Sequence, residues 1–99
     1  DQAVIVVFTR SRDDVRPFSF NLALSTSWER LEQRNIAILD VDPLRHDVDA
    51  VAEQLGLGDM EFAVVLIDRD GTTVMTTPRD DALGELLAAF DLRETGEPR

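Results

Sequence analysis

Ala3-Val4-Ile5-Val6-Val7-Phe8 is the stretch of sequence that decides the fold. A continuous apolar run rich in β-branched residues is typical of a strand that is covered on both faces. Similar runs follow at Ile36-Ala37-Ile38-Leu39-Asp40-Val41 and at Phe62-Ala63-Val64-Val65-Leu66-Ile67, each bounded by polar or turn residues. We therefore expect three strands, with the first and third runs at the centre of one sheet.

A fourth, shorter strand is predicted after the third run. Asp68-Arg69-Asp70-Gly71 carries the Asp-Gly signal of a hairpin turn, and residues 72–77 then form a Thr-rich segment of alternating polarity. Pro78 ends this segment because proline cannot donate a backbone hydrogen bond to a neighbouring strand. We expect this strand at an edge of the sheet.

Two segments have clear helical periodicity. The first has apolar residues at i, i+3, i+4 and i+7, with Asp47 placed as an N-cap and Gly56 as a left-handed C-cap; the residues are Val48, Val51, Ala52 and Leu55. The second repeats this spacing at Leu83, Leu86, Leu87 and Phe90. After Leu92 the apolar period stops, so residues 93–99 are predicted to be a charged, flexible tail.

Residues 17–33 fit two patterns. Phe18, Phe20, Leu22 and Leu24 alternate as in a strand, whereas Phe20, Leu24, Trp28 and Leu31 form a helical stripe. A helix is favoured because Pro17 suits a first helical turn and because two parallel strands need a crossover connection. The spacing also predicts that Trp28 and the phenylalanines belong to the core.

These elements predict one α/β domain over residues 1–92, in the order βαβ-α-ββα. We expect a four-stranded mixed sheet of order 2-1-3-4 with helices on both faces. Strands 1 and 2 should be parallel, and strands 3 and 4 antiparallel to that pair.

Composition excludes several classes of function. The 99 residues include 20 acidic and 10 basic side chains, a formal net charge of −10 that disfavours nucleic acid as a partner. The chain has no cysteine, which excludes disulfides, thiol nucleophiles and thiolate metal sites. No apolar run approaches the ~20 residues of a membrane helix, so we expect no membrane insertion.

The predicted order of elements resembles the core of the thioredoxin fold over residues 3–91. Thioredoxins are similar in placing a Cys-x-x-Cys motif after the first strand, where this chain has Thr9-Arg10-Ser11-Arg12-Asp13-Asp14. They also have a cis-proline before the third strand, where this chain has Met60-Glu61-Phe62. Both redox hallmarks are missing, so the resemblance implies the fold without its thiol chemistry.

A closer resemblance is to the domain-of-unknown-function 4174 family of small exported bacterial proteins and sushi-repeat matrix proteins. It rests on Val6-Val7-Phe8, on residues 62–71, and on residues 83–91 followed by a charged tail. The family usually has Gly-Lys at Asp68-Arg69 and a Met-Pro-Met-Arg-like ending at Leu92-Arg93-Glu94. The resemblance implies a thioredoxin-like domain in the periplasm or outside the cell, without established catalytic residues.

Two constellations suggest chemistry, and both have simpler explanations. Residues 64–72 resemble the Asp-x-Asp-Gly-Thr signature of haloacid-dehalogenase phosphatases, with Asp68 as nucleophile and Asp70 as general acid. Only 27 residues follow Thr72 in the chain of 99, too few for the remaining phosphatase machinery, and a hairpin explains the same residues. His46 lies near four aspartates (Asp40, Asp42, Asp47 and Asp49), but their spacing matches no metal motif. We expect no cofactor and no metal.

The candidate binding residues follow the first strand and precede the third: Thr9, Arg10, Ser11, Arg12 and Glu61. Together with the turn at 42–46 they are predicted to converge at one sheet edge, where basic charge would attract a small acidic ligand or a protein partner bearing carboxylates. The simpler alternative is that surface arginines pair with Asp13, Asp14 or Glu29. The sequence thus favours a non-redox binding or interaction module, over an enzyme of unrecognised type or a purely structural domain.

Overall fold

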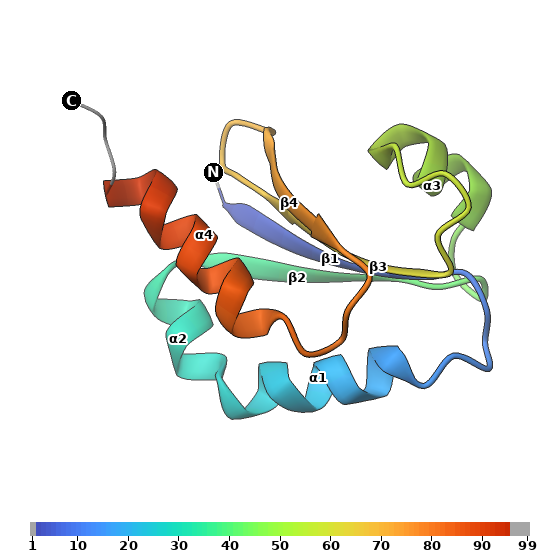
Figure 1. The fold of residues 1–99 in the computed structure, drawn as a ribbon, viewed down its shortest axis with the longest axis horizontal. Coiled ribbons are helices and arrows are strands. Elements are labelled where there is room, and N and C mark those ends of the chain that lie inside the picture. The colour runs from blue at the N-terminus through green and yellow to red at the C-terminus, as the bar shows by residue number, and fades with distance from the viewer. Residues whose placement is uncertain (1, 96–99) are drawn as a thin grey trace.

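A central sheet carries helices on both of its faces in the computed structural model, which describes residues 2–95 (Figure 1). The elements follow the predicted order, except that two helices occupy the first crossover. They are β1 (Ala3–Thr9), α1 (Arg16–Thr26), α2 (Trp28–Gln33), β2 (Ile36–Val41), α3 (Val48–Leu55), β3 (Phe62–Ile67), β4 (Thr73–Thr77) and α4 (Leu83–Thr95).

The sheet has the predicted order β2-β1-β3-β4. β1 pairs with β2 in parallel, with Val7 opposite Asp40, and pairs with β3 in antiparallel fashion, with Val7 opposite Val64. The fully apolar strands are therefore central, as predicted. The prediction for the direction of the fourth strand is wrong: the hairpin reverses the chain, so β4 is antiparallel to β3 and runs in the direction of β1.

β1 separates two apolar clusters because successive side chains of a strand point to opposite faces. Ile5 and Val7 face the cluster that α1, α2 and α4 cover, whereas Val6 and Phe8 face the cluster that includes Ala52 of α3. A strand that is buried on both faces must be apolar at every position. This requirement explains the uninterrupted run in β1.

The first crossover is two helices rather than the predicted single one. At the end of α1 the Ser25 and Thr26 hydroxyls donate to the carbonyls of Leu22 and Ala23, and the backbone leaves helical geometry at Ser27 (φ −119°, ψ 20°). Side-chain hydroxyls that bond to the preceding turn compete with helix continuation. The break rotates α2 relative to α1 and thereby changes which of its side chains face the core.

The prediction that Trp28 and all the phenylalanines belong to the core is wrong at two positions. Phe18 is 69% exposed and Trp28 is 51% exposed, whereas Phe20 and Leu31 are fully buried. Phe18 lies two residues from Phe20 on a helix, about 200° around its axis, so the two cannot share a face. Trp28 lies just beyond the break and begins α2.

The local signals for α3 and the hairpin are confirmed. The Asp47 side chain accepts a hydrogen bond from the backbone N–H of Ala50, and Gly56 ends the helix in the left-handed region at φ 69°. Gly71 adopts φ 88° in the turn that joins β3 to β4.

α4 ends at Thr95, three residues beyond the predicted end at Leu92. Two ion pairs attach this last turn to the β3–β4 turn: Arg93 with Asp68 at 2.6 Å and Glu94 with Arg69 at 2.7 Å. Residues 93–95 lack the apolar period that would pack this turn against the core, and these long-range ion pairs hold it in place instead. The other residues of the predicted tail, 96–99, lie outside the described residues. Within residues 2–95, no helix combines the length and apolar character needed to cross a membrane.

Candidate functional site

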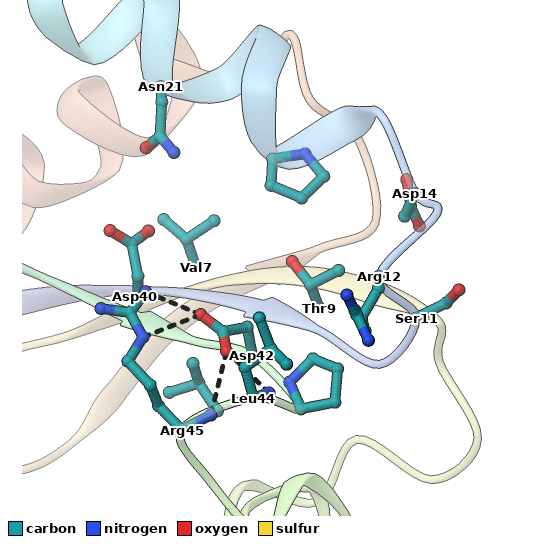
Figure 2. A pocket seen from close by; sticks show the side chains of 13 residues that line it. Val7, Thr9, Ser11, Arg12, Asp14, Asn21, Asp40, Asp42, Leu44 and Arg45 are labelled. Atoms are coloured by element: carbon teal, nitrogen blue, oxygen red, sulfur yellow. Dashed lines mark hydrogen bonds and ion pairs between the residues drawn. The ribbon is translucent and has the colours of Figure 1, made fainter.

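A pocket of about 440 Å³ lies at the carboxyl ends of the parallel strands β1 and β2 (Figure 2). Val7 and Thr9 of β1 lie two residues apart on one face, and Asp40 of β2 is paired with Val7 in the same face of the sheet. Pro17 and Asn21, one turn apart on α1, line the pocket from the opposite side. Ligands of open α/β sheets commonly bind beyond the carboxyl ends of strands.

Two loops complete the pocket. Ser11 and Arg12 come from the β1–α1 loop, and Leu44 and Arg45 come from the loop that follows β2. Val41, Asp14, Asp42 and Pro43 also line it. Thr9 is only 6% exposed, so its hydroxyl lies at the base of the pocket rather than on the surface.

Two of the aspartates in the pocket are neutralised by arginines. Arg16 donates to Asp14 through Nε at 2.9 Å and Nη2 at 2.6 Å, and this side-chain contact lowers the pKa of the Asp14 carboxyl. Arg45 donates from Nε at 3.1 Å and from Nη2 at 2.7 Å to Oδ2 of Asp42, and this side-chain contact lowers the pKa of that carboxyl. The Arg16–Asp14 pair matches the alternative interpretation of the sequence, in which surface arginines pair with nearby acids.

Arg12 and Asp40 are the other two charged groups of the pocket. Neither side chain has a hydrogen bond or an ion pair with another of the residues 2–95. Figure 2 shows them at opposite sides of the pocket, with Arg12 beside Thr9 and Ser11 and with Asp40 below Asn21. The pocket therefore offers one available cation and one available anion.

Arg10 does not line this pocket, although Arg10 and Arg12 both line a second hollow, together with Asp13 and Pro43. Its guanidinium donates to the carbonyls of Met60 at 3.1 Å and Gly58 at 2.8 Å, and it forms an ion pair with Asp49. Its backbone N–H donates to the carbonyl of Glu61 at 2.9 Å. Arg10 thus connects the end of β1 to the segment that precedes β3.

The predicted site residues therefore divide into two sets. Thr9, Ser11 and Arg12 line the pocket, together with the predicted turn that follows β2. Arg10 and Glu61 lie outside it and are joined by one backbone hydrogen bond, and the Glu61 residue is exposed.

Sequence reasoning missed the contribution of α1. Pro17 and Asn21 are spaced i, i+4 and follow directly on the candidate loop, so a helical reading of 17–33 could have placed both on one face. The competing alternation of apolar residues in this segment hid that signal.

Three of the four aspartates near His46 have other partners, and Asp40 lines the pocket. Asp42 pairs with Arg45, Asp49 pairs with Arg10, and Asp47 caps α3. No group of three or more potential metal-ligating side chains converges among residues 2–95.

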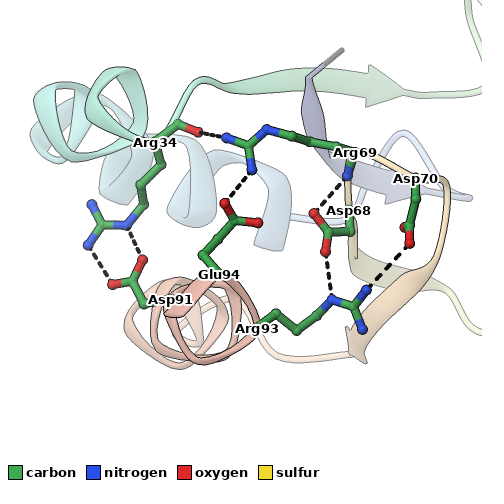
Figure 3. Close-up of polar contacts among 7 residues, drawn as sticks. All are labelled: Arg34, Asp68, Arg69, Asp70, Asp91, Arg93 and Glu94. Carbon is green, nitrogen blue, oxygen red and sulfur yellow. Dashed lines mark hydrogen bonds and ion pairs between the residues drawn. The ribbon is translucent and has the colours of Figure 1, made fainter. Parts of the chain in front are cut away.

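The phosphatase-like aspartates serve the hairpin and its contact with α4 (Figure 3). Asp68 is 8% exposed and accepts from Arg93 Nε at 2.6 Å and from the backbone N–H of Arg69 at 2.7 Å. Asp70 accepts from the backbone N–H of Thr72 at 3.0 Å. Both carboxylates therefore stabilise the hairpin turn, and Asp68 also joins this turn to α4.

Solved structures identify the class of fold. A malarial protein aligns over 92% of this chain and 96% of its own, with a TM-score of 0.69 at 12% identity. Thioredoxin-2 of the malaria parasite, a component of that organism's protein secretion machinery, aligns over 91% of this chain and 82% of its own, with a TM-score of 0.57 at 14% identity. The chain has a thioredoxin-like α/β fold. No protein-family model and no curated protein sequence matches it.

Proposed function

We propose that this domain is a non-redox binding module whose pocket beyond β1 and β2 accepts the carboxylate of a small molecule or of a protein partner. The observation that carries the proposal is the Arg12 guanidinium, which lines a pocket of about 440 Å³ without an ion-pair partner among residues 2–95. Arginine is well suited to a carboxylate because its planar donors can bind both oxygens.

The neighbouring hydroxyls support the same ligand chemistry. Thr9 and Ser11 lie beside Arg12, and a hydroxyl can donate to a carboxylate oxygen that the guanidinium does not use. Arg10 and Glu61 have a positioning role in this proposal. Their contacts hold the start of the β1–α1 loop against the segment before β3.

A binding module is favoured over the two alternatives. The phosphatase-like signature gives little support to an enzyme, because Asp68 is bound by Arg93. A purely structural domain does not explain a pocket with an unpaired cation. The resemblance to the domain-of-unknown-function 4174 family, with a place in the periplasm or outside the cell, forms part of the proposal.

The test is a titration of the isotopically labelled domain with hexanoate, followed by amide chemical shifts. We expect the shifts to cluster at residues 9–12 and 40–45. Arg12→Gln should weaken hexanoate binding at least fivefold, because the charge-assisted contact is lost. Arg30→Gln is the matched control, since Arg30 lies outside this pocket, and it should bind as the wild type does.

Two results would contradict the assignment. One is an unchanged hexanoate affinity in Arg12→Gln, and the other is a set of shifts confined to residues 82–91 of the α4 region.

A further inference from the structure

The charges of the pocket do not suit a simple anion. Arg16 neutralises Asp14 and Arg45 neutralises Asp42, so Asp40 is left as a carboxylate without a hydrogen bond or an ion pair, opposite Arg12. A ligand with only a carboxylate would satisfy Arg12 and would exclude water from around Asp40. Removing water from an unpaired charge is costly.

We infer that the ligand is a zwitterion, whose carboxylate binds Arg12 and whose ammonium group binds Asp40. This inference rests on the proposed function and adds the second charge of the ligand. An ammonium donates up to three hydrogen bonds, so it can bind the Asp40 carboxylate and still contact the amide oxygen of Asn21.

The strand geometry separates the backbone positions from which the two charged side chains extend. Asp40 lies opposite Val7, and Thr9 follows two residues later in β1, which is about 7 Å along the strand. Arg12 comes from the loop beyond Thr9, and Figure 2 shows it on the far side of the pocket from Asp40. Charges on opposite sides of the pocket suit a ligand with separated charges better than an α-amino acid, whose charges are adjacent. A short peptide, or an amino acid with its amine at the end of a longer chain, has such separated charges.

The middle of the pocket fits such a ligand. The Val7 side chain lies between the two charged ends (Figure 2), and Pro17 of α1 also lines the pocket. Apolar contacts there suit a methylene chain or a small side chain, whereas the two charged ends fix the direction of the ligand. A few polar groups placed around apolar walls are typical of a small-molecule site.

Arg45 also approaches Asp40, and its positive charge could compete with the ammonium. Its pKa is raised mainly by the side-chain hydrogen bond to Asp42, with Asp40 as the smallest contribution. Both Nε and Nη2 of Arg45 donate to Asp42 Oδ2. Arg45 and Asp40 interact through their charges without a hydrogen bond, so the Asp40 oxygens remain available to donors of a ligand.

The experiment compares three compounds of equal chain length on the labelled wild-type domain: hexanoate, hexylamine and 6-aminohexanoate. We expect 6-aminohexanoate to bind at least tenfold more tightly than hexanoate, with shifts at both residue 12 and residue 40. Glycine should not bind, because its charges are adjacent. Asp40→Asn should abolish the tenfold difference, whereas Asp59→Asn, an equal change of charge on an exposed residue outside the pocket, should keep it.

The outcomes separate this inference from the proposed function. Equal affinities for hexanoate and 6-aminohexanoate, or a preference that persists in Asp40→Asn, overturn the zwitterion while leaving Arg12-dependent carboxylate binding intact. An absence of binding by either compound overturns both. If the amide spectrum of Asp40→Asn loses its dispersion, which would show that the variant does not fold, Asp40→Ser serves the same comparison.

Discussion

The Asp68 carboxylate is surrounded by groups that favour its charged form. The hydrogen bond from Arg93 lowers its pKa most, and the backbone N–H of Arg69 lowers it further. Because the folded-state pKa lies below that of the unfolded chain, this contribution to stability is complete above about pH 4 and is lost as the pH falls through the folded-state value. We expect Arg93→Gln to raise the pKa of Asp68, measured by NMR titration, and to reduce the acid-dependent loss of stability.

Asp70 is an internal control for that measurement. Its pKa is lowered first by the backbone N–H of Thr72, while Arg93 acts only through its charge at 3.6 Å. The pKa of Asp70 should therefore move much less than that of Asp68 in Arg93→Gln. An equal rise at both carboxyls would mean that Arg93 acts as a distant charge rather than through its hydrogen bond to Asp68.

Individual residues also show where sequence reasoning reaches its limit. The sequence correctly placed Thr9, Ser11 and Arg12 at the end of the first strand, because a buried apolar run followed by polar residues defines that end. It could not distinguish Arg10 from Arg12. The partners of Arg10 lie 39 to 50 residues away in the chain, and no local pattern encodes which arginine will meet them.

At the scale of elements, replacing each of two glycines near helix ends by alanine should change the free energy of unfolding in opposite directions. Gly56 ends α3 at φ 69°, a conformation that strains any residue with a Cβ, so Gly56→Ala should lower the free energy of unfolding by roughly 1–2 kcal/mol. Gly84 lies inside α4, and a Cβ added there meets nothing within 4 Å. Gly84→Ala should raise the free energy of unfolding by up to about 1 kcal/mol, since alanine is the better helix former.

Urea denaturation of both variants beside the wild type measures these changes. The pair forms its own control, because the same glycine-to-alanine change is made in two backbone conformations. A loss of stability in both variants would show that the position of Gly84 in the first turn of α4 cancels the propensity effect.

Elements with a strong local signal were predictable, and elements defined by long-range contacts were less so. The caps of α3 and the hairpin turn were predicted from residues that are neighbours in the sequence, and each prediction is confirmed. The break at Ser27 and the extension of α4 to Thr95 depend on hydroxyl contacts and on ion pairs across the fold. Periodicity contains neither kind of information.

At the scale of the whole molecule, strand order was predictable because only central strands require apolar residues on both faces.

The net charge of −10 affects the stability of the whole molecule. Seven of the arginines within residues 2–95 form short ion pairs, yet acidic residues of the chain outnumber basic ones by 20 to 10, so many carboxylates repel one another over longer distances. Salt at 0.15 M screens over about 8 Å, which weakens this repulsion more than contacts near 3 Å.

Sodium chloride should therefore stabilise the domain. Between about 10 mM and 0.3 M we expect the thermal midpoint to rise by about 4 °C, equivalent to about 1 kcal/mol for a domain of this size. The double variant Glu32→Gln with Glu53→Gln removes two exposed acids and should melt higher at low salt and respond less to added salt. A midpoint that falls as salt is added would mean that the ion pairs outweigh the repulsion, and that the acidic surplus does not limit the stability of this fold.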